Sequence, residues 1–294
     1  MSSETIQRIA VIGAGQMGRG IAQVAATTGL EVLLSDASLE LATKGRDSIA
    51  SVLGRLVEKG KLTEEARAQT MERIRPVASG ADLGECDLAV EAATERFDTK
   101  IAIFKATDAS LKKGAILASN TSSISITKLA AATSRPERVI GMHFMNPVPL
   151  MKLVEIVKGI QTSAATYEAT RNLAIKMGKT VVTSNDAPGF MVNRILIPML
   201  CEACFAVQEG VGTAEDIDTG AKLGLNHPMG PLELADLIGL DTVLAIANVL
   251  YDEIGDSKYR APVLLKNLVA AGWLGKKSGR GFYKYDDKGQ KVVS

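Results

Sequence analysis

Histidine and cysteine are scarce in this chain, long apolar runs are absent, and neither sign of charge predominates. The 294 residues include only 2 histidines and 3 cysteines. An odd cysteine count does not suit a disulfide framework and is typical of a reducing compartment, so we expect a cytoplasmic protein. The longest apolar runs, such as Ile195 to Leu200, are far shorter than the roughly 20 residues of a membrane span. The opening residues, Met1 to Glu4, leave no room for a secretory signal before the first strand, and we expect none.

The balance of charge excludes a global electrostatic field as the basis of binding. The 34 basic and 33 acidic side chains leave a formal net charge of +1. We therefore expect neither nucleic acid nor a membrane as a partner, and an anionic ligand must be bound by a local arrangement. Cys201 and Cys204 have no second cysteine pair nearby, so we expect two buried thiols on one helix face and no metal site.

Short apolar runs alternate with helical stretches over the first part of the chain. These runs are Arg8–Ile12, Glu31–Leu34, Asp87–Val90, Ala115–Ala118, Val139–Met142 and Leu153–Val157. The alternation predicts an α/β domain with an extended sheet, in which the first two strands form a parallel pair. After the second run, apolar residues three and four positions apart between Ile49 and Val57 predict an amphipathic helix. Thr63 looks like the start of a partner helix, so we expect a helical hairpin inserted here.

The hydrophobic pattern of the sequence changes near residue 185. Pro188 and Gly189 form a break, and beyond them the pattern is helical with few candidate strands. The closing stretch from Gly272 to Tyr283 is rich in glycine and aromatic residues, which predicts a tight irregular segment. We therefore predict an α/β domain over residues 1–185 and an all-α domain over residues 186–294.

A glycine motif directly follows the first apolar run. It matches G-x-G-x-x-G and consists of Gly13, Ala14, Gly15, Gln16, Met17 and Gly18. The first glycine permits a tight turn, the second lets the backbone approach a pyrophosphate, and the third lets helix and strand pack closely. The N–H groups at the start of the following helix suit phosphates. The hexapeptide alone is a weak signal, but a strand before it and a helix after it predict dinucleotide binding.

A single acid suggests which dinucleotide is bound. Asp36 lies 18 residues after Gly18, at the end of the second apolar run. A carboxylate at this place accepts hydrogen bonds from both ribose hydroxyls and would repel a 2′-phosphate. We therefore predict NAD rather than NADP as the cofactor.

The two histidines are the natural candidates for proton exchange near neutral pH. His143 directly follows the apolar run 139–142, and active-site side chains in open α/β sheets cluster beyond the carboxyl ends of strands. His227 lies in a loop rich in proline and glycine, where a structural role is expected. His143 is therefore the candidate acid/base.

An acidic residue inside an apolar strand supports this choice. Glu155 interrupts the run from Leu153 to Val157, and a buried carboxylate is costly unless it is paired. The His143 imidazole is a suitable partner, which would fix its tautomer and raise its basicity. An ion pair with Lys152 or Lys158 is the alternative.

Two further polar groups follow strands or breaks. The stretch 119–123 places Asn120 and Ser122 at the end of another strand, and Asn193 lies just past the break at Pro188. Each is unremarkable alone. Beside a nicotinamide they could hold a substrate oxygen.

Five longer motifs stand out: SNTSSIS (119–125), GMHFMNPVP (141–149), MKLVEIV (151–157), PGFMVNR (188–194) and NHPMGPLEL (226–234). Together they resemble the motifs of the 3-hydroxyacyl-CoA dehydrogenase family, and most closely those of its free-standing bacterial 3-hydroxybutyryl-CoA dehydrogenases. The resemblance covers essentially the whole chain. It implies a Rossmann-type NAD-binding domain followed by a helical domain that forms a homodimer.

The resemblance also implies roles for particular residues. His143 matches the catalytic histidine, Glu155 its partner, and Ser122 and Asn193 the residues that contact the reacting oxygen or the nicotinamide region. Glu95 and Lys100 match cofactor contacts. We therefore expect hydride transfer between NAD(H) and a short 3-hydroxyacyl-CoA or its 3-keto form.

Contacts with the CoA moiety align less firmly. Arg55, Lys59 and Lys61 on the hairpin are candidates for CoA phosphates, although solvated surface charge explains them as well. Two other functions stay open. One is a dehydrogenase of free β-hydroxyacids that acts through a lysine, and the other is a non-catalytic NAD-binding sensor or structural protein.

Overall fold

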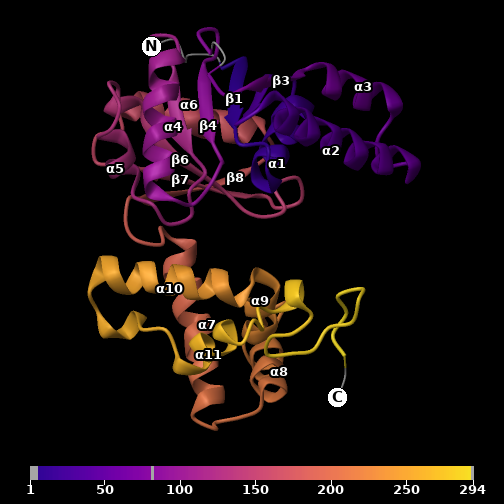
Figure 1. Ribbon diagram of the computed structural model, residues 1–294, viewed down its shortest axis with the longest axis vertical. Helices are drawn as coiled ribbons and strands as arrows, with labels where there is room; N and C mark the ends of the chain where they lie inside the picture. The colour runs from indigo at the N-terminus through magenta and orange to yellow at the C-terminus, as the bar shows by residue number, and fades with distance from the viewer. Residues whose placement is uncertain (1–5, 81–82, 293–294) are drawn as a thin grey trace. The chain divides into compact units, whose positions relative to one another are not determined.

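The structure, a computed structural model, describes residues 6–80 and 83–292. Contacts between residues divide the chain into two compact units, residues 1–187 and 188–294. The division falls after Ala187, close to the break predicted near residue 185. In Figure 1 the first unit runs from indigo to pink and the second from orange to yellow.

The first unit is built on one mixed sheet. Its described strands are β1 (Arg8–Ile12), β2 (Glu31–Asp36), β3 (Ile74–Ala78), β4 (Leu88–Glu91), β5 (Ile116–Ser119), β6 (Val139–Phe144), β7 (Leu153–Lys158) and β8 (Thr180–Asn185). Their order across the sheet is β3-β2-β1-β4-β5-β6-β7-β8. All neighbouring pairs are parallel except β6 and β7, which are antiparallel. The α/β class predicted from the alternating pattern is confirmed.

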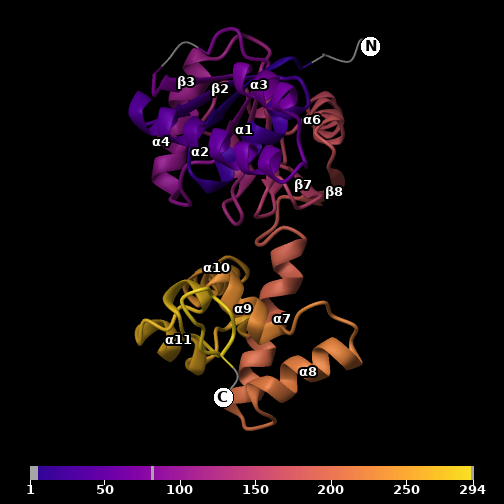
Figure 2. The same cartoon turned by 90° about the vertical axis from the view of Figure 1, so that its right-hand side faces the viewer.

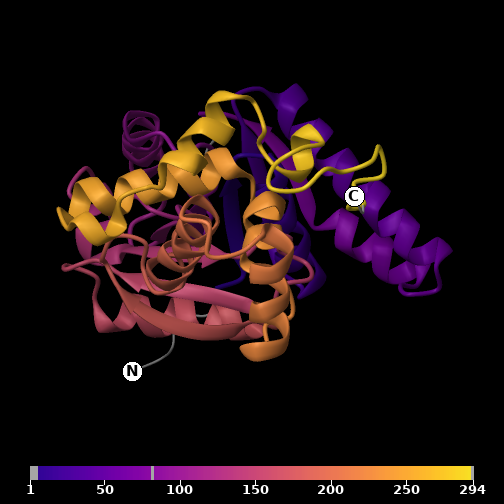
Figure 3. The ribbon, with the colours of Figure 1, turned by 90° about the horizontal axis from the view of Figure 1, so that it is seen from below.

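Helices connect these strands. Those of the first unit are α1 (Gln16–Thr27), α2 (Leu39–Glu58), α3 (Glu64–Glu72), α4 (Phe97–Ser110), α5 (Ile126–Ala130), α6 (Ala164–Lys176) and the 3-10 turn η1 (Pro136–Arg138). The helical hairpin predicted after β2 is confirmed as α2 and α3, and it projects from the unit in Figures 1 and 3. Ser38 and Thr63 begin its two helices by accepting hydrogen bonds from Leu41 N and Ala66 N.

Two strands were not predicted, and both lie at the edges of the sheet. β3 carries Arg75 and Pro76, and β8 (TVVTSN) is largely polar. An edge strand pairs on one side only, so it tolerates proline and polar side chains that a central strand excludes. For this reason neither segment has the apolar signature of the inner strands.

The second unit is helical, as predicted. Its described helices are α7 (Val192–Gln208), α8 (Ala214–Gly224), α9 (Pro231–Ile238), α10 (Leu240–Ile254), α11 (Val263–Ala270) and the 3-10 turns η2 (Ser257–Tyr259) and η3 (Lys276–Ser278). α7 contacts all four of the other α-helices, as Figure 2 helps to show. Its buried face, which includes Leu200 and Cys204, packs with Leu232 and Leu250 in a separate apolar core.

Two buried carboxylates organise this second unit. Asp218 accepts hydrogen bonds from Leu232 N and Glu233 N at the start of α9, at 2.8 and 2.9 Å. Asp236 accepts from Phe282 N and Tyr283 N at 3.0 Å each and so holds the closing segment. Both acids are almost fully buried and hydrogen-bonded, which is how a folded chain accommodates such groups.

Among the described residues, no single helix has the length and apolar character needed to cross a membrane. α9 and α10 meet that test only when they are taken together, and they are bent by 98° where they join.

Candidate active site

The topology of the sheet places the predicted motifs along one edge, which is formed by the carboxyl ends of the parallel strands and not by an outer strand. β1, β2, β4, β5 and β6 are parallel, so their carboxyl ends share this edge. The strand order reverses between β1 and β4, which makes this the switch point of the sheet. Ligands of open α/β sheets bind in the crevice outside the carboxyl ends at such a point.

The glycine turn after β1 is closely packed at two of its three glycines. A Cβ on Gly18 would lie 1.7 Å from the carbonyl oxygen of Gly13, so only glycine lets α1 begin here. Gly13 has φ +104°, and a Cβ there would lie 2.7 Å from the carbonyl oxygen of Ala92. Fold and backbone conformation therefore account for these two glycines.

Gly15 has no such explanation within the chain. Its φ is −68° and its ψ −169°, a conformation open to any residue, and a Cβ there would meet no described atom within 4 Å. Gly15 is also the N-cap of α1, beside the backbone N–H groups that open the helix. A glycine that packing does not require suits the close approach of a phosphate, so the turn fits a dinucleotide.

Asp36 lies next to this turn, at the end of β2. Its Oδ2 accepts a hydrogen bond from Ala14 N at 2.7 Å, and its Oδ1 accepts from Ala37 N at 2.7 Å. The carboxylate is therefore fixed against the glycine turn, at the position where a ribose acid is expected.

His143 and Glu155 are direct neighbours in the antiparallel pair β6–β7. Their Cα atoms are register partners, which places both side chains on one face of the sheet. His143 Nδ1 and Glu155 Oε2 are 2.7 Å apart. Glu155 is completely buried and His143 is 7% exposed. This is the contact expected from the sequence, and it favours the tautomer in which Nδ1 donates to the carboxylate.

Polar contacts fasten the loops around His143 to one another. Asn120 Oδ1 accepts a hydrogen bond from Phe144 N at 2.9 Å, which joins the ends of β5 and β6. Gln16 Nε2 donates to Asn146 Oδ1, also at 2.9 Å, and so links the start of α1 to the loop after β6. Gln16 belongs to the predicted dinucleotide motif and Asn120 to the polar groups predicted near the nicotinamide, and both contact the end of β6 or the loop after it.

Lys179 supports the same loop and was not predicted from the sequence. Its Nζ donates to the carbonyl oxygens of Val148 and Met151 at 2.5 and 2.8 Å. Burial lowers the pKa of this lysine. Val148 in turn packs over Gly20 of α1, where a Cβ would lie 2.7 Å from Val148 Cβ.

Ser122 lies in a turn gathered around one carboxylate oxygen. Glu95 Oε1 accepts hydrogen bonds from Ser122 N and Oγ at 2.7 and 3.0 Å, and from Thr121 Oγ1 at 2.6 Å. Partial burial alone would raise the pKa of Glu95, but the charge of Lys100 and the hydrogen bonds from Thr121 and Ser122 outweigh this effect and hold that pKa below its usual range. Glu95 therefore stays ionised at neutral pH.

Lys100 is buried beneath this turn. Its Nζ lies 2.6 Å from Glu91 Oε2 and 3.5 Å from Glu95 Oε2, and its side chain is 2% exposed. Glu91 was not singled out from the sequence. The available signal was a carboxylate that ends the buried strand LAVE, similar to the signal that drew attention to Glu155.

The remaining predicted residues lie away from this edge or in the other unit. Asn193 is buried in the first turn of α7, within the second unit. Arg55 and Lys59 are exposed at the end of α2. Their predicted contacts with substrate stay predictions.

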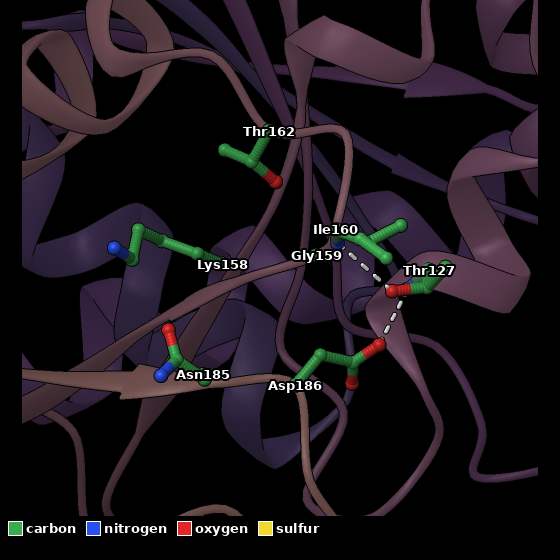
Figure 4. A pocket seen from close by; sticks show the side chains of 7 residues that line it. All are labelled: Thr127, Lys158, Gly159, Ile160, Thr162, Asn185 and Asp186. Carbon is green, nitrogen blue, oxygen red and sulfur yellow. Dashed lines mark hydrogen bonds between the residues drawn. The ribbon is translucent and has the colours of Figure 1, made fainter.

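A cavity of about 490 Å³ lies elsewhere in the first unit (Figure 4). It is lined by Thr127, Lys158, Gly159, Ile160, Thr162, Asn185 and Asp186. Thr127 Oγ1 accepts from Ile160 N at 3.1 Å, and Thr127 N donates to Asp186. Because β7 runs antiparallel to β6, its last residue, Lys158, lies at the sheet edge opposite His143. None of the predicted site residues lines this cavity.

Comparison with known proteins agrees with this arrangement. Residues 8–187 match the family model described as 3-hydroxyacyl-CoA dehydrogenase, NAD binding domain. Residues 189–285 match the model described as 3-hydroxyacyl-CoA dehydrogenase, C-terminal domain. The chain belongs to the 3-hydroxyacyl-CoA dehydrogenase family. The resemblance inferred from the motifs is thus confirmed, and with it NAD as the cofactor of the first unit.

Several relatives are similar over their whole length. The chain is 54% identical to a 3-hydroxybutyryl-CoA dehydrogenase of Bradyrhizobium diazoefficiens, over 98% of each chain. It is 47% identical to one of Clostridioides difficile, over 95% of this chain and 99% of that one. The crystal structure of (S)-3-hydroxybutyryl-CoA dehydrogenase from Ralstonia eutropha is 51% identical, with a TM-score of 0.94, over 96% of this chain and all of that one.

Proposed function

We propose that this protein is an NAD-dependent dehydrogenase that interconverts (S)-3-hydroxybutyryl-CoA and acetoacetyl-CoA. The observation that carries the proposal is the buried His143–Glu155 pair, 2.7 Å apart at the carboxyl end of β6. This pair lies on the sheet edge that also holds the glycine turn and Asp36. The names of the full-length relatives supply the substrate class.

The residues have distinct parts in the reaction. Bound NAD supplies the hydride acceptor, and NADH the donor. Because Nδ1 of His143 is engaged by Glu155, we assign proton exchange with the 3-oxygen to Nε2. Glu155 stabilises the imidazolium that forms when His143 takes the proton of the hydroxyl. Ser122 and Asn193 position the oxygen, and in the reductive direction the imidazolium returns the proton.

Other parts of the chain are assigned by the same resemblance. Glu95 and Lys100 serve the cofactor side of the site, and Arg55 and Lys59 bind the phosphates of CoA. The second unit forms a homodimer. The three cysteines are buried and unpaired by disulfides, which fits a reducing cytoplasm.

The test is reduction of acetoacetyl-CoA by NADH, followed through the loss of NADH absorbance. The wild-type protein should turn over this substrate, and His143→Ala should lose about 10²–10⁴-fold in kcat. Its NADH affinity should be unchanged. Because that variant leaves the buried Glu155 without its imidazole partner, His143→Asn provides a second variant, which places an amide N–H donor at this position.

The other histidine offers a matched control. His227→Ala lies in the second unit, in a loop after α8, and should keep wild-type kcat. If His143→Ala and His143→Asn both turned over acetoacetyl-CoA at the wild-type rate, the assignment of the acid/base would be wrong. Turnover of free 3-hydroxybutyrate instead of its CoA ester would indicate a dehydrogenase of free acids.

A further inference from the structure

Glu91 is a buried carboxylate that the proposed mechanism does not use. It ends β4 and is 0% exposed. Both of its oxygens are fully engaged: Oε1 accepts from Ala93 N and Lys100 Nζ at 2.8 Å each, and Oε2 accepts from Lys100 Nζ and Ser119 Oγ at 2.6 and 2.8 Å. This oxygen set ties the ends of β4 and β5 to the first turn of α4.

A buried ion pair of this kind needs a reason other than stability. Removing two charges from water costs several kcal/mol per ion, and well-packed apolar residues are often as stable or more so. Glu91 and Lys100 are 0% and 2% exposed, so this cost is close to its maximum. In some proteins such a pair serves to fix a particular geometry.

Lys100 links the buried Glu91 to Glu95, which is partly exposed. Its ammonium also lies 3.5 Å from Glu95 Oε2, and the side chain of Glu95 is 42% exposed. The other oxygen of Glu95 holds the backbone and hydroxyl groups of Ser122 and Ser123. The network therefore runs from Glu91 in the sheet, through Lys100, to Glu95, which holds the turn that carries Ser122.

We propose that Glu91 is a positioning residue: it holds Lys100 against Glu95 and thereby fixes the turn 121–123 at the active site. Without the Glu91 charge, the Lys100 ammonium loses its two shortest contacts and no longer has a fixed place from which to hold Glu95. The hydrogen bonds that gather Ser122 then form around a mobile acceptor. This inference rests on the proposed function for its kinetic consequences but not for its structural ones.

The structural readout is backbone hydrogen exchange measured on the peptide that covers residues 119–125. Ser122 N and Ser123 N donate to Glu95, so their exchange reports whether Glu95 is fixed. Glu91→Gln should accelerate this exchange. Asp108→Asn is the control, because Asp108 also forms an ion pair in the same unit, with Arg135, although that pair is less buried. The described hydrogen bonds of its side chain go to Ser134 and Arg135 and not to the turn 121–123. It should destabilise the protein without accelerating exchange at 119–125 selectively.

The kinetic readout is acetoacetyl-CoA reduction measured well below the melting temperature. Glu91→Gln should lower kcat by up to about 10²-fold, the cost of a small misplacement in an active site. Asp108→Asn should keep wild-type kcat and KM. A double-mutant cycle with Lys100→Met separates a direct from an indirect effect. If Glu91 acts through Lys100, the double variant is no slower than Lys100→Met alone.

Three results would overturn the proposal. The first is exchange at 119–125 in Glu91→Gln that matches the Asp108→Asn control. The second is wild-type kcat in folded Glu91→Gln, and the third is a pair of effects that simply multiply in the double variant. A wild-type protein without acetoacetyl-CoA reductase activity would instead contradict the proposed function, and the exchange experiment would still decide the role of Glu91.

Discussion

Gly15 offers a sharp test of the cofactor site, because the fold does not require a glycine there. Gly15→Ala adds one methyl group at a position where no described atom lies within 4 Å and φ is −68°. Alanine is a poorer N-cap than glycine, so the free energy of unfolding should fall by no more than about 1 kcal/mol and the melting temperature by no more than about 4 °C. A bound pyrophosphate, in contrast, would meet the methyl group directly.

The expected loss of NADH affinity follows from the cost of overpacking. An extra methyl group in a closely packed site costs about 1–3 kcal/mol. At 1.4 kcal/mol for each factor of ten, this corresponds to a dissociation constant raised about 5- to 150-fold. The assay is a fluorescence titration with NADH, accompanied by a thermal melt of each variant.

Two other glycines serve as controls for the same added methyl group. Gly18→Ala places a Cβ 1.7 Å from the carbonyl oxygen of Gly13, so this variant should lose stability as well as binding. Gly220→Ala, in the exposed part of α8, meets nothing within 4 Å and should leave NADH affinity unchanged. Wild-type NADH affinity in folded Gly15→Ala would refute the assignment of the glycine turn to the cofactor.

Three further predictions concern single side chains. Glu155→Gln removes a charge interaction worth up to about 4 kcal/mol, so kcat should fall by as much as about 10³-fold. When His143→Asn is already present, adding Glu155→Gln should lower kcat hardly further. Additive losses would contradict the coupling between His143 and Glu155. Asp36→Ala should weaken NADH selectively, and an unchanged ratio of NADH to NADPH affinity would contradict its role. Burial raises the pKa of Cys86 and Cys201 to about 11 and that of Cys204 to about 12. The thiols of the folded protein should therefore stay protonated and unreactive at about pH 8 and react faster as the pH rises. All 3 cysteines should react with a thiol reagent in denaturant, and fast labelling of the native protein would contradict this prediction.

Local sequence patterns predicted those strands and helices in which burial determines which positions are apolar. The inner strands are apolar runs because helices cover them, and the hairpin α2–α3 carries its periodicity and its caps in its own residues. β3 and β8 were not predicted, because an edge strand needs neither a continuous apolar run nor a periodic apolar pattern. The helical second unit was likewise visible from the loss of strand patterns after Pro188.

The site was predictable where a single residue breaks a local rule. Glu155 is a charge inside an apolar strand, and pairing with His143 follows from the cost of burying it. The network of Glu91, Lys100 and Glu95 was not predictable in this way, because its members meet the turn 121–123 only through the order of β4 and β5 in the sheet. Contacts between residues 26 to 28 positions apart, such as Glu95 with Thr121 and Ser122, leave no local pattern.

The antiparallel step between β6 and β7 has a consequence for the durability of the enzyme. His143 and Glu155 face each other because main-chain hydrogen bonds fix the register of two inner strands, and no loop adjustment is needed to bring them together. Local fraying of loops and helix ends should leave this couple assembled, since inner strands are among the last elements to open. Heat should therefore separate His143 from Glu155 only when the first unit itself melts.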